Sequence, residues 1–392
     1  MFIFENTILI LALLTSLALI LLLFNTVRNA IIFNHVLPCE NTARHIPYVS
    51  VLIPARNEED IIEDCIRSLC NQTYLQYEVI VLNDHSTDDT GNILHSLCAE
   101  YPQLTVIDGG VLPSHWIGKP HACHQLAMHA KGDYLLFTDA DTIHDTSSIA
   151  SMVQFAIKHD IDMLSAVPRQ ELKLFWEHVA VPFIHTLYLT YLPHDLIMKN
   201  PHPQFAAANG QALLFKKESY QQIGGHTSVA NSIAEDIDLA IRIKSFGMRL
   251  CHASASEIVS CRMYRTSRDV FTGFSKNAFA TMHYDMHKLL FFISHLFITY
   301  VFPIIGLCIG IFLNNTSIIL FNGLSILLAM SLRLIIAMYF GYPLWHSFLH
   351  ALTASTFIVF AINSALWSKK KNGTEWKGRT YSLSKQAKPI IS

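Results

Sequence analysis

The sequence has little charge of either sign and no regular arrangement of its cysteines. Among its 392 residues there are 28 Lys and Arg and 30 Asp and Glu, which gives a net charge of −2. This balance argues against a nucleic-acid-binding protein, because such proteins carry an excess of basic side chains on one face. The eight cysteines show neither the paired spacing of a zinc site nor the density of a secreted disulfide scaffold. We therefore expect free thiols in a reducing compartment.

Long apolar runs hold much of the hydrophobic content, which reaches 51% of the chain. The first run, residues 8–24, is long enough to span a bilayer. A cleaved signal peptide would require a basic start and a small-residue cleavage site, but this start carries Glu5 and no basic residue, and the first charged residue after the run is Arg28. We predict an uncleaved transmembrane anchor over residues 1–28, with the Arg28 side in the cytoplasm.

Three further candidate membrane segments lie within residues 289–368. They are residues 289–313, 318–339 and 344–367. The basic tail that follows, residues 369–392, is expected in the cytoplasm. If the middle of the chain lies in the cytoplasm, three full crossings would place this tail outside the cell. One of the three segments should therefore not cross the membrane. The segment with Arg333 is the first candidate for an interfacial or re-entrant piece, because arginine is costly in lipid, and the last segment is the alternative.

Between the apolar regions, strand-like runs alternate with helical patterns. Short apolar runs are each followed by a polar loop and then by apolar residues at helical spacing. Strands are predicted at residues 49–53, 78–82, 104–107 and 134–138, and helices at about 60–70, 90–100 and 118–130. This order predicts an α/β domain around a parallel sheet with right-handed crossovers.

Acidic residues follow three of these strands, and a further acid opens a later helix. Glu58 and Asp84 lie after the first two strands, Asp139 and Asp141 follow the fourth, and Asp236 begins the helix. Each of them alone could be a turn or helix-cap residue. Together they favour a site at the carboxyl ends of the strands, where a metal and a diphosphate bind and a carboxylate acts as base. Asp139 and Asp141 offer the oxygen ligands that Mg²⁺ or Mn²⁺ prefers.

Lys119 and two glycine-containing dipeptides are further candidates. Lys119 follows a glycine in a predicted loop and is either a phosphate partner or a solvated lysine; the glycine spacing of a P-loop is absent. Asn209-Gly210 and Gly224-Gly225 mark tight turns.

Four motifs in this order resemble the family 2 inverting glycosyltransferases of GT-A fold. They are Pro54-Ala55-Arg56-Asn57-Glu58, Asn83-Asp84-His85-Ser86-Thr87-Asp88, Asp139-Ala140-Asp141 and Glu235-Asp236. The resemblance implies a Rossmann-like GT-A domain over residues 48–285 and a nucleotide-sugar donor, usually UDP-linked. It also implies site residues: Pro54, Ala55, Glu58 and Asp84 for the nucleotide, Asp139 and Asp141 for the diphosphate and the Mg²⁺ or Mn²⁺, and Asp236 as the catalytic base.

Further motifs resemble the membrane-bound branch that includes the carotenoid glycosyltransferases. They lie at residues 116–123, 262–265, 273–276 and 375–382. This resemblance implies the transfer of a single hexose to a lipid acceptor. We therefore expect a multi-pass protein of the cell (inner) membrane, with a cytoplasmic catalytic domain, that transfers glucose from UDP-glucose to a carotenoid.

One motif of the processive relatives is missing, namely Gln-x-x-Arg-Trp after the base. Arg262, Arg265 and Lys276 are nearby cations that could contact the diphosphate instead, together with Lys119. Three residues mark the expected acceptor region, namely Asn209, Gly210 and Glu235. The alternatives are a processive polysaccharide synthase, a glycosyltransferase for another lipid (hopanoid, sterol or sphingolipid), and a membrane-tethered binding protein with a degenerate site.

Overall fold

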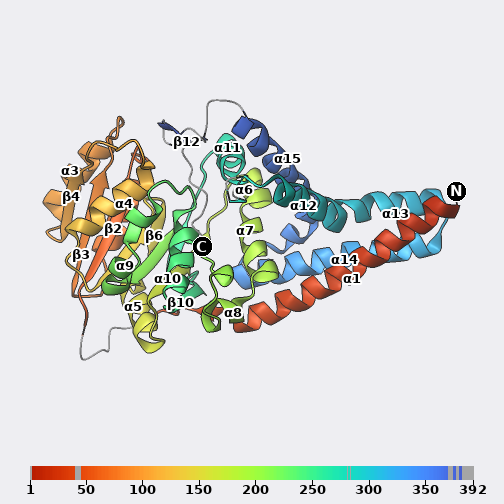
Figure 1. Cartoon of the computed structure of the whole chain (residues 1–392), viewed down its shortest axis with the longest axis horizontal. Helices are drawn as coiled ribbons and strands as arrows, with labels where there is room; N and C mark the ends of the chain where they lie inside the picture. Colours follow the sequence, from red (N-terminus) through yellow and green to blue (C-terminus); the bar gives the residue numbers. More distant parts are fainter. Residues whose placement is uncertain are drawn as a thin grey trace. The chain divides into compact units, whose positions relative to one another are not determined.

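The computed structural model describes residues 2–39, 46–279, 281–282, 284–369, 374–376 and 379–381. The chain falls into two compact units, which are both visible in Figure 1. One unit, which we call the helical unit, comprises Met1–Ile32, Leu172–Leu192 and Tyr264–Gly373. The other, the α/β unit, comprises Phe33–Glu171, Pro193–Met263 and Thr374–Ser392.

An eight-stranded sheet forms the centre of the α/β unit. In spatial order its strands are β1 (Asn34–His35), β10 (Leu250–Ser254), β7 (Met163–Val167), β9 (Ala212–Lys216), β5 (Tyr134–Thr138), β2 (Val49–Ala55), β3 (Tyr77–Asn83) and β4 (Leu104–Asp108). The four strands predicted from the sequence, β2 to β5, are all present and parallel, as expected. The sheet as a whole is mixed, because β9 runs antiparallel between β5 and β7.

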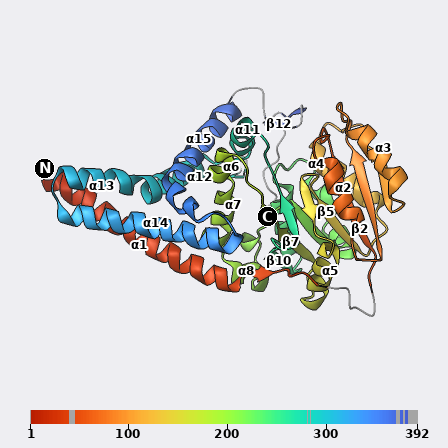
Figure 2. The ribbon, with the colours of Figure 1, turned by 180° about the vertical axis from the view of Figure 1, so that it is seen from behind.

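Helices cover both faces of this sheet: α4 lies in front of it in Figure 1, and α2 lies in front of it in Figure 2. The central strands are largely apolar because both of their faces are covered; Leu135 and Leu136 of β5 are 1% and 0% exposed. The helices are α2 (Ile62–Cys70), α3 (Thr90–Glu100), α4 (Gly118–His129), α5 (Ser148–Lys158), α8 (His194–Lys199), α9 (Lys217–Gln222) and α10 (Glu235–Ser245). A small second sheet consists of β6 (Thr142–His144), β11 (Val259–Cys261) and β8 (Arg169–Gln170), and β12 (Thr374–Trp376) pairs with β13 (Arg379–Tyr381).

The helical unit contains four stretches that are long and apolar enough to cross a membrane. They are Phe2–Ile32, Met286–Phe312, Thr316–Phe340 and Leu344–Ser368. Each coincides with a segment predicted from the sequence. The main helices are α1 (Phe2–Ile32), α12 (Met286–Leu296), α13 (Phe302–Phe312), α14 (Thr316–Phe340) and α15 (His350–Lys369), with α6 (Phe175–Ala180), α7 (Pro182–Thr186) and α11 (Ser267–Asn277) beside them.

The direction of α1 and α14 is the same, and α13 runs in the opposite direction. Ser16 Oγ lies 2.9 Å from Ser325 Oγ, and Asn315 Nδ2 lies 3.2 Å from Glu5 Oε2, so corresponding parts of α1 and α14 meet in parallel. A Cβ atom at Gly306 of α13 would lie 2.4 Å from Oδ1 of Asn322, so this glycine permits a close approach of α13 and α14. These three helices lie side by side in Figure 1 and Figure 2.

Helix α15 packs mainly against α11, α12, α6 and the turn Phe297–Val301 that joins α12 to α13, and it makes a smaller contact with α14. Aromatic contacts make up much of this packing; the rings of Phe274 and Phe360 are stacked with centroids 5.5 Å apart. Two segments that the sequence placed in the predicted 48–285 domain, Leu172–Leu192 and the start of Tyr264–Gly373, belong to this unit as well.

Candidate active site

The Asp139–Asp141 turn begins where β5 ends and is held by hydrogen bonds on both sides. The carbonyl oxygen of Gln211 accepts from Thr138 Oγ1 at 2.9 Å and from the backbone N–H of Asp139 at 3.2 Å. The Thr142 hydroxyl donates to the carbonyl oxygen of Asp139 at 2.7 Å. The antiparallel strand β9 therefore anchors the turn, which places both carboxylates at the carboxyl end of β5 as the sequence predicted.

His144 lies beneath this turn and was not identified from the sequence. Its Nε2 lies 3.0 Å from Thr138 Oγ1 and 3.2 Å from Thr142 Oγ1, while its Nδ1 lies 3.2 Å from Ser148 Oγ. Burial lowers the pKa of His144 to about 3, so the imidazole is neutral near pH 7. The sequence pattern that could have identified His144 consists of the hydroxyl residues Thr138 and Thr142, four positions apart, and the histidine two positions after the second.

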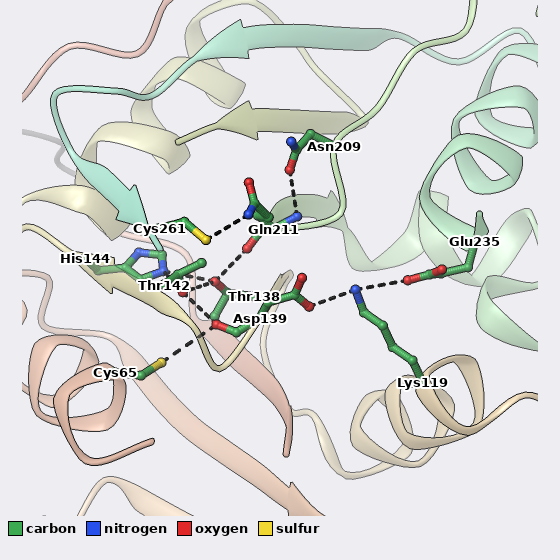
Figure 3. Close-up of polar contacts among 10 residues, drawn as sticks. All are labelled: Cys65, Lys119, Thr138, Asp139, Thr142, His144, Asn209, Gln211, Glu235 and Cys261. Atoms are coloured by element: carbon green, nitrogen blue, oxygen red, sulfur yellow. Dashed lines mark hydrogen bonds and ion pairs between the residues drawn. The ribbon is translucent and has the colours of Figure 1, made fainter. Parts of the chain in front are cut away.

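Lys119 connects the Asp139 turn to the start of α10. Figure 3 shows its ammonium group between two carboxylates, 2.8 Å from Asp139 Oδ1 and 3.1 Å from Glu235 Oε1. Burial disfavours the charged amine, but the two carboxylates outweigh this effect and hold the pKa of Lys119 well above its ordinary value. Lys119 is therefore a charged, partly buried group of the site. We call this three-residue arrangement the Lys119 bridge.

Asp236 follows Glu235 in the first turn of α10. One carboxylate oxygen, Oδ1, accepts from the backbone N–H of Ile237 at 2.9 Å. A Cβ atom at Gly210 would lie 3.3 Å from the other oxygen, Oδ2, so the backbone at Gly210 approaches the carboxylate closely. Burial and the neighbouring Glu235 raise the pKa of Asp236 to about 7. A carboxylate with this pKa is suited to accept a proton near neutral pH.

Asn209 and Gly210, which were predicted to mark a tight turn in the acceptor region, lie just before β9. The backbone N–H of Asn209 donates to Ser165 Oγ at 2.7 Å, and its side-chain oxygen accepts from the N–H of Gln211 at 2.9 Å. This hydrogen bonding fixes the backbone that faces Asp236.

Loops after β2 and β3 form the other end of the site, and they are tied to each other. The guanidinium of Arg56 donates to the carbonyl oxygens of Asp84 and His85, and the side-chain oxygen of Asn57 accepts from the N–H of Thr87 at 2.8 Å. Asn57 and His85 both have a positive φ, of 53° and 54°. The two loops therefore form one rigid edge, next to the strand ends.

This edge carries the residues expected to hold the nucleotide. Ala55, at the end of β2, pairs with Asn83 of β3, so Pro54, Ala55 and Asp84 are neighbours across two adjacent strands. Asp84 is only 2% exposed, and a Cβ atom at Gly109 would lie 3.2 Å from both its Cα and its Oδ1. Glu58 follows in the loop, where its backbone N–H donates to Thr90 Oγ1 at 2.8 Å.

The three cations expected near the diphosphate lie in different parts of the chain. Arg262 follows β11 in the α/β unit, whereas Arg265 and Lys276 belong to the helical unit. Their contact with a diphosphate remains a prediction. All other residues that we proposed for the site belong to the α/β unit.

The carboxylates of Asp139 and Asp141 also fit a divalent metal ion. One oxygen of Asp141, Oδ1, is buried without a hydrogen-bond partner, and burial together with Asp139 raises the pKa of Asp141 to about 7. The described residues hold no group of three His, Cys, Asp or Glu side chains arranged for a metal. Mg²⁺ and Mn²⁺ commonly bind through one or two carboxylates while substrate phosphates and water complete the coordination. The donor set therefore fits a metal that shares a bound diphosphate.

A mixed sheet whose strand ends carry these acids is the framework of a glycosyltransferase of GT-A fold. Residues 50–224 match the sequence profile of glycosyl transferase family 2. The chain thus contains a family 2 domain and is a glycosyltransferase.

Two kinds of similarity extend beyond this domain. The chain is 27% identical over 379 residues to the 4,4'-diaponeurosporenoate glycosyltransferase of Staphylococcus aureus strain USA300, covering 91% of this chain and 95% of that protein. The corresponding protein of strain MRSA252 is 26% identical over the same shares. Among solved structures, a mannosyltransferase of Pyrobaculum calidifontis in complex with GDP-mannose and Mn²⁺ is similar over 93% of this chain and 100% of that chain, with a TM-score of 0.57 and 18% identity. The structural similarity confirms the predicted fold class.

Proposed function

We propose that this glycosyltransferase is a metal-dependent inverting enzyme of the cell membrane that transfers one hexose, glucose from UDP-glucose, to a carotenoid or similar lipid. The observation that carries the proposal is the position of Asp236 at the start of α10, next to Gly210 and with a pKa raised to about 7. The relatives named for 4,4'-diaponeurosporenoate support a carotenoid acceptor.

The donor would bind along the carboxyl ends of β2, β3 and β5. Ala55, Glu58 and Asp84 would hold the nucleotide, next to Pro54. Lys119 would donate to the diphosphate from its place beside Asp139. Asp139 and Asp141 would hold Mg²⁺ or Mn²⁺, which supplies positive charge to the leaving diphosphate.

Asp236 would take the proton of an attacking hydroxyl group. Because its pKa lies near 7, about half of the enzyme carries the ionised base at neutral pH. A carboxylate acceptor is already ionised at this pH and needs no base. In either case a single in-line attack converts an α-linked donor into a β-linked product.

The helix directions support a specific membrane topology. Since α1 and α14 are parallel and α13 is antiparallel to both, three crossings return the chain to the side on which α1 ends. Helix α15 packs against α11 and α12, and we therefore assign the non-crossing, interfacial role to α15 rather than to the segment with Arg333. With the catalytic unit in the cytoplasm, the basic tail then lies there too. Most of this tail, residues 369–392, lies outside the described residues.

The release of UDP from UDP-glucose by membranes that contain the full chain tests the proposal. The assay compares samples with Mn²⁺ and with a chelator, with and without a carotenoid extract. For a carotenoid alcohol, we expect extract-dependent release that falls about 100-fold or more in Asp236→Asn, because loss of a general base has effects of this size. Asp238→Asn, a change of the same charge in the same helical turn, serves as the control and should leave release unchanged.

Two outcomes would contradict the proposal. UDP release that ignores the extract and accompanies polymer formation would indicate a processive synthase. Metal-dependent binding of UDP without release from any sugar donor would indicate a binding protein. With a carotenoid acid as acceptor, a small effect of Asp236→Asn is expected, since the attacking carboxylate is already ionised.

A further inference from the structure

Arg333 is a buried charge in the middle of an apolar helix. It is the one charged residue of α14, and its side chain is 4% exposed. Its Nη1 donates to the hydroxyl of Thr186 in α7 at 3.2 Å, whereas its Nε and Nη2 have no hydrogen-bond partner. Such a group is strongly unfavourable unless an anion compensates it.

The described residues provide no such anion. No Asp or Glu among them forms an ion pair with Arg333, and the titratable groups that feel its charge are Tyr300, Tyr342, His346 and His350. None of these four side chains is negatively charged near pH 7. Within the described part of the chain, Arg333 therefore has no counter-charge.

The unpaired edge of the guanidinium has the geometry of an anion-binding group. Nε–H and one N–H of Nη2 point in the same direction, and this fork matches two oxygens of a carboxylate or phosphate. Because the fork is planar and always charged, arginine is the side chain best suited to such bidentate binding. The hydrogen bond from Nη1 to Thr186 fixes the opposite edge of the group and leaves the fork in place.

Neighbouring histidines add further unpaired polar atoms. Nε2 of His185, Nδ1 of His346 and Nε2 of His350 are all buried without a hydrogen-bond partner. His185 is held by a hydrogen bond of 2.8 Å between its Nδ1 and the hydroxyl of Tyr342, and burial lowers its pKa to about 3. The region thus combines a fixed positive charge with neutral polar groups, which suits one bound anion.

We propose that Arg333, together with Thr186, binds the anionic head group of a membrane amphiphile, through a phosphate or a carboxylate. Arg333 lies seven residues before the end of α14 at Phe340, which corresponds to about 10 Å along the helix. Large apolar side chains on the same helix are exposed, including Leu327 at 62% and Met338 at 59%. The inference rests on the membrane placement proposed above and does not depend on sugar transfer.

The first test identifies what the full-length protein retains after purification in a neutral detergent. Mass spectrometry of the extracted lipids compares the wild type with Arg333→Met, which removes the charge and keeps a long apolar side chain. Lys288→Met is the control, because Lys288 is an exposed cation in α12 and reports general attraction of acidic lipids. We expect the wild type and the control to retain one anionic amphiphile per chain, and Arg333→Met to retain at least about tenfold less, as for a lost charged hydrogen bond.

The second test measures thermal unfolding in lipid nanodiscs. The nanodiscs contain phosphatidylcholine alone, with added phosphatidylglycerol, or with an added long-chain carboxylate; a fourth sample adds inorganic phosphate. We expect one of the two added amphiphiles to raise the unfolding midpoint of the wild type and of Lys288→Met but not that of Arg333→Met. The amphiphile that does so identifies the head group as a phosphate or a carboxylate. Thr186→Val keeps the charge and should show a smaller increase than the wild type.

Three results would overturn the inference. They are an equal content of anionic amphiphile in the wild type and Arg333→Met, an increase in midpoint that Arg333→Met retains, and an increase caused by inorganic phosphate alone. UDP release by the same preparations is measured in parallel, so that a failure of the sugar-transfer proposal is seen separately from a failure of lipid binding.

Discussion

The replacement of Lys119 by methionine tests the charge balance of the site. Lys119 lies 2.8 Å from Asp139 Oδ1 and 3.1 Å from Glu235 Oε1, and its positive charge also lowers the pKa of Asp236. Methionine keeps the length of the side chain and removes this charge. Asp236 then keeps its acidic neighbours and loses the positive charge of Lys119, so its pKa must rise from the present value of about 7.

The size of the effect follows from the fraction of ionised base. An increase of about one pKa unit, typical for the loss of a neighbouring charge, lowers the ionised fraction of Asp236 at pH 7 from about a half to about a tenth. We therefore expect kcat at pH 7 to fall about fivefold and to recover as the pH approaches 9. The sign follows from the role of a base, which is active only when ionised, so a higher pKa moves the rise in rate to higher pH.

The assay is the pH dependence of kcat for UDP release with a carotenoid alcohol, measured for the wild type, Lys119→Met and Lys119→Arg. The arginine variant keeps the charge and should keep the pH profile. Lys131→Met removes an exposed lysine of the same unit and is the control for net charge. Superimposable profiles of the wild type and Lys119→Met, or a shift of the methionine variant to lower pH, would refute the reasoning. A rise in KM for UDP-glucose without a change in profile would show that Lys119 contacts only the donor.

Three further changes test other contacts of the site. Gly210→Ala places a Cβ atom 3.3 Å from Asp236 Oδ2, so kcat should fall about tenfold while KM for the donor and the unfolding midpoint change little. Gly109→Ala places a Cβ atom 3.2 Å from the Cα of Asp84, so the main effect should be a higher KM for UDP-glucose, measured in the same assay. His144→Ala should lower the free energy of unfolding by about 1–3 kcal/mol in denaturant titrations, because it removes the buried hydrogen bonds of the imidazole to Thr138, Thr142 and Ser148. Since burial lowers the pKa of His144 to about 3, the wild type should lose stability as the pH falls below about 6.5, and the variant should lack this part of the loss.

Local sequence patterns were sufficient to predict the first half of the α/β unit. The strands β2 to β5 begin and end within two residues of their predicted positions, because each is a short apolar run followed by a polar loop. The acids of the Asp139–Asp141 turn could be placed at the end of β5 for the same reason. A strand that is buried on both faces must end where charged residues begin.

Contacts between distant segments could not be read from the sequence. The direction of β9 is set by the path of the chain through residues 168–211, and its five-residue apolar run is compatible with either direction. The ion pair of Lys119 with Glu235 joins residues that are 116 positions apart, and no pattern near Lys119 indicates its partner. The parallel packing of α1 and α14, which changed our choice of the interfacial segment, is likewise a tertiary property.

The ion pairs of the Lys119 bridge affect the order in which a metal and the donor bind. Asp139 raises the pKa of Asp141, Glu235 raises the pKa of Asp236, and Lys119 forms ion pairs with both Asp139 and Glu235. A metal bound to Asp139 without a diphosphate would have to compete with the Lys119 ammonium for the same oxygen. A diphosphate that arrives with the metal offers Lys119 new oxygens in exchange, so the bridge can open without leaving any charge unpaired. We therefore expect the metal and the donor to bind together, rather than the metal alone.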